Sequence, residues 1–265
     1  MDDNFEIKGT WWLPSNPTQK IAGTLKFIRK DGISLELHES FTSASSPYDF
    51  MVTEIIHGES YEGKEVTLYN CFETTKGPPT VVVANNLFIG KLFDCPESIK
   101  FSSVRVNYEH LEEWLGGARF EREIKPPFSV KHTPPQDFNI ELPSIDASLR
   151  LDYRCSSQGD LLRTAQLQHT DYLELCSKTP QNYLWYTDNL YALHLFIVLM
   201  VGGVVETNSV LGYGDVIHQV RDKEIREEIE IHRVPSDIYS KKINPWHIIF
   251  RLPDLGEQIQ NYIDK

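Results

Sequence analysis

The chain has 265 residues and a formal net charge of −12 at pH 7. This length allows a substantial buried core and one or two domains. The acidic balance excludes a general basic surface for phosphate groups, which argues against direct nucleic-acid binding. Because Met1-Asp-Asp-Asn4 is acidic and polar rather than basic and then apolar, we expect a cytoplasmic protein without a secretory signal.

The first forty residues predict a β-hairpin. Apolar residues alternate in residues 21–28 and again in residues 33–37, on either side of Asp31-Gly32. A glycine after aspartate supplies the positive φ that tight hairpin turns need. Before this hairpin, Trp11-Trp12 stands close to Pro14, where a central strand would have to end. We expect one indole to face the core and the other the rim.

The next part of the chain reads as short strands separated by Gly, Pro and Asn. This spacing indicates an antiparallel β-sandwich or open barrel, which we place at residues 1–125. A short helix before Gly116 closes it. The expected strands cover residues 49–56, 65–69, 80–84, 87–90 and 98–106, and the helix covers residues 109–115.

Residues 126–265 predict a smaller α+β unit that follows the mainly β first half. Prolines at residues 126–127 and 134–135 suggest the linker between them. The expected elements are a hairpin of residues 138–142 and 148–153, at least one strand within 161–175, a buried helix near 184–201 and a C-terminal helix from about Leu255. The apolar run at residues 191–201 is too short for a membrane span. The apolar stripe still continues at Ile263, so we expect the front part of a longer polypeptide.

No motif predicts a metal or a cofactor. His169, Asp171, Glu174 and Cys176 carry ligand-type side chains, but close polar residues without a second cluster are usually structural. The Gly212-Tyr-Gly-Asp215 segment lacks the remaining features of a phosphate loop, and we expect a turn. The four scattered cysteines are interpreted as reduced core thiols.

Two adjacent aromatic pairs are the candidate binding residues: Trp11 with Trp12, and Trp185 with Tyr186. Exposed Trp and Tyr favour protein interfaces or stacking on sugar rings. The alternative is that the members of each pair pack on opposite faces of a sheet. A carbohydrate- or nucleotide-binding β-sandwich is therefore one hypothesis for the function.

The segments Ile7-Lys-Gly-Thr-Trp-Trp-Leu-Pro14 and Ile21-Ala-Gly-Thr-Leu25, with the strand at residues 33–37, resemble the N-terminal domain of the ApeA family of bacterial antiphage proteins. The resemblance implies a β-rich region that normally precedes a C-terminal HEPN ribonuclease domain, which acts in abortive infection. It also implies a recognition or regulatory role for this chain, with the HEPN domain, a phage protein or a small ligand as partners. A homo-oligomer is a further expectation.

HEPN ribonucleases pair an Arg and a His at the spacing seen in Arg226 and His232. A catalytic reading would give His232 acid–base work and Arg226 the stabilisation of a charged transition state. Three acidic residues between them would repel RNA, and the segment alternates like a strand. Catalysis by this chain is therefore the least favoured of the three hypotheses.

Overall fold

The computed structural model describes residues 4–29, 31–41, 50–116, 120–123, 129–158, 166–202, 205–220 and 223–233. The chain divides into two compact units, which are described separately. Within the described ranges, the first unit contains residues 4–101 and 211–233, and the second contains residues 102–210. Residues 211–233 therefore pack with the first unit although they come late in the chain, whereas the sequence suggests one boundary near residue 125.

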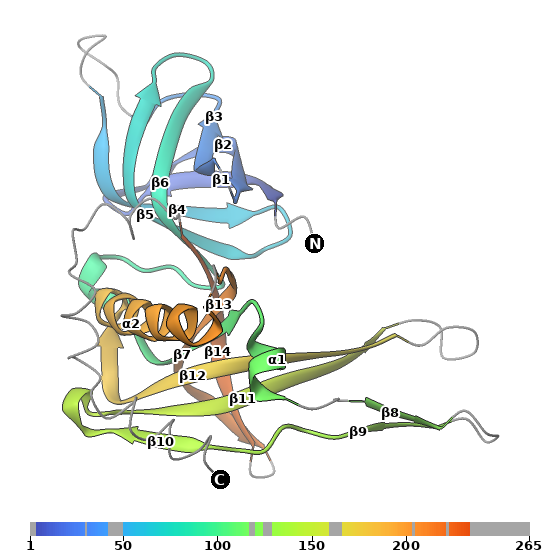
Figure 1. The fold of residues 1–265 in the computed structure, drawn as a ribbon. Coiled ribbons are helices and arrows are strands. Elements are labelled where there is room, and N and C mark those ends of the chain that lie inside the picture. Colours follow the sequence, from blue (N-terminus) through green and yellow to red (C-terminus); the bar gives the residue numbers. More distant parts are fainter. Residues whose placement is uncertain are drawn as a thin grey trace. The chain divides into compact units, whose positions relative to one another are not determined.

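The first unit is built on a closed, six-stranded antiparallel barrel (Figure 1). The order of pairing is β1-β2-β3-β6-β5-β4, and β4 pairs back with β1 to close the ring. Its strands are β1 (Phe5–Leu13), β2 (Asn16–Ile28), β3 (Gly32–Leu37), β4 (Val52–Ser60), β5 (Glu65–Thr75) and β6 (Thr80–Ile89). The mainly antiparallel β architecture is thus confirmed, and the barrel is closed rather than open.

The predicted hairpin is confirmed as β2 and β3. Phe27 lies opposite Ile33, and Asp31 donates its backbone N–H to the carbonyl of Ile28. Gly32 has φ 101°, a conformation that L residues with a side chain rarely adopt. The two strands expected at residues 80–84 and 87–90 are instead one continuous strand, β6.

Side chains fill the barrel interior. Trp11 is fully buried at its centre, surrounded by leucine, isoleucine, valine and phenylalanine from the other strands. The backbone makes room for this indole at two glycines on the flanking strands. A Cβ at Gly58 would overlap the six-membered ring of Trp11, and a Cβ at Gly23 would lie 3.1 Å from its Cδ1 atom. In the part of the chain that the structure describes, side chains therefore occupy the interior of this small barrel.

Two later strands, β13 (Thr207–Val220) and β14 (Lys223–Arg233), bring residues from far along the chain to the first unit. β14 pairs with the end of β6, where Glu230 lies opposite Ile89. Gly212 belongs to β13, which corrects the turn expected there. The glycine has a packing role within this strand. A Cβ at Gly212 would lie 2.6 Å from the ring of Phe101, so glycine allows the ring to pack against the backbone.

The second unit contains an antiparallel sheet of order β10-β11-β12-β7 with a long helix, α2, along one face (Figure 1). The hairpin predicted at residues 138–153 and the helix predicted near 184–201 are both confirmed. The elements are β7 (Lys100–Tyr108), α1 (Leu111–Leu115), β8 (Phe120–Glu123), β9 (Ser129–His132), β10 (Asn139–Leu142), β11 (Ala147–Gln158), β12 (Gln166–Asn182) and α2 (Tyr183–Val201). Part of the predicted linker is therefore a strand, β9.

Polar contacts fix α2 on the sheet. Asn182 caps the helix by accepting the backbone N–H of Trp185 at 2.8 Å, and Gly202 ends it in the left-handed conformation. The hydroxyl of Tyr186 lies 2.6 Å from that of Ser177 on β12. The hydroxyl of Tyr108 on β7 donates to the carbonyl of Leu190.

On the opposite face of β12, one carboxylate is fully buried among cationic side chains. Glu174 accepts from Arg150 Nε at 2.8 Å and from the Ser103 hydroxyl at 2.5 Å, while Arg105 Nε lies 3.3 Å away. Burial opposes ionisation of this carboxyl. The hydrogen bonds from Arg150 and Ser103 and the charge of Arg105 outweigh the burial, so the pKa of Glu174 lies below its ordinary value.

Three further expectations from the sequence have different outcomes. Within the described residues, no helix is both long and apolar enough to cross a membrane. All four cysteines are free thiols, but only Cys71 is buried, which corrects the expectation of four core thiols. The expected C-terminal helix lies outside the described residues.

We predict that Gly58→Ala destabilises the first unit by about 1–3 kcal/mol, because the added methyl group overlaps the Trp11 ring. Urea unfolding followed by tryptophan fluorescence measures the change. Glu59→Ala is the matched control, since this neighbour is exposed and its carboxylate lies 3.6 Å from Lys20 Nζ at the surface. The control should change the free energy of unfolding by less than about 0.5 kcal/mol. Equal stability of both variants would contradict the packing described for Trp11.

We predict that Glu174→Gln costs about 3 kcal/mol at pH 7, because it leaves two arginines around a neutral group. A carboxyl whose pKa is lowered by folding stabilises the protein above its unfolded pKa of about 4.3. That contribution is lost as the pH falls through the folded pKa. Urea unfolding of both proteins between pH 7 and pH 3 should therefore show the difference shrinking at acidic pH. A difference independent of pH would refute the assignment.

Candidate functional site

The structure buries both tryptophans of the first predicted pair. Trp11 points into the barrel and is 0% exposed, while Trp12 lies on the outer face and is 7% exposed. This corrects the expectation that one indole faces the rim. The two side chains do pack on opposite faces of the strand, as in the alternative reading.

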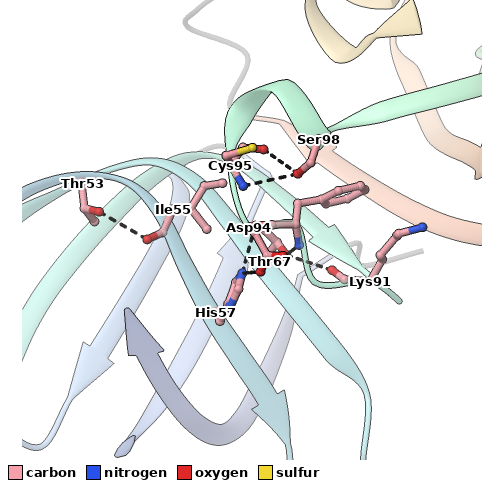
Figure 2. A network of polar contacts seen from close by, with 9 residues as sticks. Thr53, Ile55, His57, Thr67, Lys91, Asp94, Cys95 and Ser98 are labelled. Carbon is pink, nitrogen blue, oxygen red and sulfur yellow. Dashed lines mark hydrogen bonds and ion pairs between the residues drawn. The ribbon is translucent and has the colours of Figure 1, made fainter. Parts of the chain in front are cut away.

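The histidine beside Trp12 is tied to a loop after β6. His57 on β4 donates from Nε2 to the carbonyl of Phe93 at 2.9 Å, and the Thr67 hydroxyl accepts the N–H of Phe93 and donates to the carbonyl of Lys91 (Figure 2). The Trp12 ring meets His57 edge-on at 5.9 Å. This network is a structural support for the outer wall of the barrel.

The second aromatic pair is split by the packing of α2. Tyr186 is 1% exposed, and burial raises the pKa of its hydroxyl to about 12. Trp185 is partly exposed and contacts Tyr186 edge-on at 4.8 Å. Of the four aromatic candidates, Trp185 alone therefore retains a partly open ring.

Arg226 and His232 both lie on β14, which confirms the strand predicted for this segment. Six residues of extended chain separate their backbones by roughly 20 Å. The His232 ring packs against Phe5 at 4.9 Å and Phe27 at 4.8 Å between centroids. Its Nε2 atom is buried and lies 3.7 Å from a carboxylate oxygen of Glu230.

The first unit has a cleft of about 620 Å³ at the end of the barrel where Phe5 and His232 lie. It forms because β4 stops pairing with β1 at Gly9 and Ser60, so the first four residues of β1 extend beyond β4. Its residues are Phe5, Glu6, Ile7, Lys8, Ser60, Tyr61, Glu62, Lys64, Ile89 and Glu230. The volume falls within the range of ligand sites in proteins.

The cleft has an apolar floor and a charged rim. Phe5, Ile7 and Ile89 belong to or pack against the barrel core, whereas Tyr61 is 70% exposed. Three carboxylates and two ammonium groups surround this floor: Glu6, Glu62, Glu230, Lys8 and Lys64. The cleft could not be predicted from the sequence, because barrel closure and the pairing of β14 with β6 bring together residues that are up to 225 positions apart.

A chain of two histidines and a carboxylate lies in the second unit. His169 Nε2 is 2.6 Å from Asp171 Oδ1, and His169 Nδ1 is 2.9 Å from His132 Nε2. The side chains of His169 and Asp171 are 2% and 0% exposed. The ring of Tyr153 stacks on His169 at 5.3 Å, and Asn107 donates to the backbone carbonyl of Asp171.

The order of hydrogen bonds follows from the carboxylate when His169 is neutral. The carboxylate of Asp171 accepts from His169 Nε2, so Nδ1 of the neutral ring carries a lone pair. His132 then donates from Nε2 to this nitrogen.

The residues considered from the sequence as metal ligands do not converge. His169 and Asp171 lie on one face of β12, whereas Glu174 and Cys176 alternate onto the other. Within the described residues, no group of three or more His, Cys, Asp or Glu side chains could hold a metal ion. The partner that completes the histidine pair, His132, comes from 37 positions earlier.

We predict that Asp171→Asn lowers the free energy of unfolding by about 1–3 kcal/mol, since a buried charge-assisted hydrogen bond is lost. His132→Gln is the matched control and should cost less, because His132 is only partly buried. Long-range ¹H–¹⁵N spectra of the wild type should show His169 protonated at Nε2. Protonation of neutral His169 at Nδ1 instead would contradict the hydrogen-bond order.

Comparison with known proteins identifies the family. The family described as "ApeA N-terminal domain 1" matches residues 6–265, which is nearly the whole chain, so the chain belongs to this family. No curated protein and no solved structure matches it. Membership supports the context of an antiphage-defence protein.

Proposed function

We propose that this chain is the non-catalytic recognition and regulatory module of an antiphage-defence protein. In this role it senses an infection signal and restrains a C-terminal HEPN ribonuclease domain. Its family supports the defence context, and its net charge of −12 argues against RNA as the ligand. The partner domain and the cytoplasmic location belong to the same proposal.

The cleft at the end of the barrel is the observation that carries the proposal. The barrel interior is filled by Trp11 and its neighbours, which favours a ligand site on the outside. The cleft combines an apolar floor with polar groups at its rim, which is the usual composition of a binding site. A recognition role uses these features without requiring a reactive group.

Two other functions have less support. A ribonuclease that uses Arg226 and His232 would need them close together, yet they lie at separate positions along one strand. A carbohydrate- or nucleotide-binding platform would need exposed rings, yet Trp11, Trp12 and Tyr186 are buried. The cleft supports recognition without either arrangement.

A plaque assay tests the proposal in bacteria that carry the gene in its full genomic length. We expect Tyr61→Ala to reduce protection against a restricted phage at least tenfold, because it removes the exposed ring at the rim of the cleft. Phe72→Ala is the matched control, since this aromatic residue of the same unit is 47% exposed and does not line the cleft. It should protect as the wild type does.

Two measurements complete the test. Both purified variants should melt within about 3 °C of the wild type, since each change is on the surface. The purified chain should leave RNA intact. Equal protection by Tyr61→Ala and Phe72→Ala would refute the cleft as the recognition surface, and RNA cleavage that His232→Ala abolishes would refute a non-catalytic role.

A further inference from the structure

We propose that the cleft binds an extended, positively charged peptide segment, which adds to β1 as an antiparallel strand beside Phe5–Lys8. This inference rests on the proposed recognition function and names the class of partner. Strand addition derives its affinity from backbone hydrogen bonds and its selectivity from alternating side chains. The segment Phe5–Lys8 offers both a backbone edge for hydrogen bonds and side chains that alternate between two faces.

The pairing of β1 with its neighbouring strands changes at Gly9. From Gly9 to Trp12 the strand pairs with β2 on one side and β4 on the other, but before Gly9 it pairs with β2 alone within the described residues. The N–H of Tyr61 donates to the carbonyl of Lys8 at 3.0 Å, which is the last bond on the β4 side. The preceding residues form a short edge that borders the cleft.

The alternation of the strand shows which backbone groups face the cleft. Because the carbonyl of Lys8 points to the β4 side, the N–H and C=O of Glu6 point the same way. An added strand would therefore exchange two hydrogen bonds with Glu6. The N–H of Lys8 faces the same side and offers a further donor.

The side chains predict an alternating peptide. Phe5 and Ile7 pack toward the barrel core, whereas Glu6 and Lys8 are exposed on the other face. In an antiparallel pair, directly opposite residues project to the same face. The peptide residue opposite Glu6 would therefore project outward beside its carboxylate, and the peptide residues on either side of it would point to the apolar floor.

The charges of the rim select a cationic partner. Glu6, Glu62 and Glu230 outnumber Lys8 and Lys64, and the chain carries −12 overall. Opposite charges across a strand pair are stabilising, and the net field steers cations toward the surface. The same charges repel nucleic acid and a second copy of this chain.

The test uses the 265-residue chain and a fluorescein-labelled Lys-Val-Lys-Val-Lys-Val peptide with blocked ends, measured by fluorescence anisotropy. We expect saturable binding, and at least tenfold weaker binding of the Glu-Val-Glu-Val-Glu-Val peptide. Loss of binding in Tyr61→Ala but not in Phe72→Ala would place the peptide in the cleft. Equal binding of both peptides, or no binding of either, would overturn the proposal.

Backbone methylation distinguishes strand addition from simple charge attraction. When lysine lies opposite Glu6, the lysine N–H groups face β1 and the valine N–H groups face away. N-methylation of the lysine amides should therefore weaken binding at least tenfold, while N-methylation of the valine amides should leave it within about twofold. Equal effects of the two modifications would overturn strand addition.

A matched pair of variants tests the edge from the protein side. Glu6→Pro removes the carboxylate and the N–H that faces the cleft, whereas Glu6→Ala removes the carboxylate alone. We expect Glu6→Pro to bind the peptide at least threefold more weakly than Glu6→Ala, and equal binding would contradict the proposal. If Glu6→Pro does not fold, the methylated peptides still decide the question on the wild-type chain.

The outcome also separates this inference from the function on which it rests. If Tyr61→Ala loses phage protection but neither peptide binds, the cleft remains a recognition site and the cationic strand is refuted. If the lysine peptide binds as expected but Tyr61→Ala protects fully, strand binding stands and the defence role of the cleft is refuted.

Discussion

The first unit depends on the burial of one indole between two glycines. Trp11 fills the centre of the barrel, and Gly23 and Gly58 allow the flanking strands to approach its ring. Full burial of a large aromatic side chain contributes a large share of a small core. Trp11 and the apolar side chains around it fill the interior, and the cleft lies where β4 stops pairing with β1.

The second unit buries charged side chains together with polar or charged partners. Glu174 on one face of β12 is surrounded by Arg105, Arg150 and Ser103. On the other face, the buried carboxylate of Asp171 accepts a hydrogen bond from Nε2 of the buried His169. Charges buried in this way are stable only with their partners in place, so they favour one register of the sheet over its alternatives.

Local patterns of the sequence predicted local structure. The alternation around Asp31-Gly32 predicted a hairpin, and the apolar run from Leu184 predicted α2, because both signals lie within one element. Closure of the barrel was not predictable, since it depends on the pairing of Gly9 with Ser60, which no local pattern encodes. The turn predicted at Gly212 was wrong, because this glycine makes room for the ring of Phe101, which lies far away in the sequence.

The return of β14 to the first unit affects how the chain folds as it is made. The end of β6 pairs with Glu230–Arg233, and His232 packs between Phe5 and Phe27. A ribosome must therefore add more than 140 residues after β6 before this edge is covered. During that interval the barrel exposes part of a strand edge and an aromatic surface, which is the kind of surface that chaperones protect from aggregation.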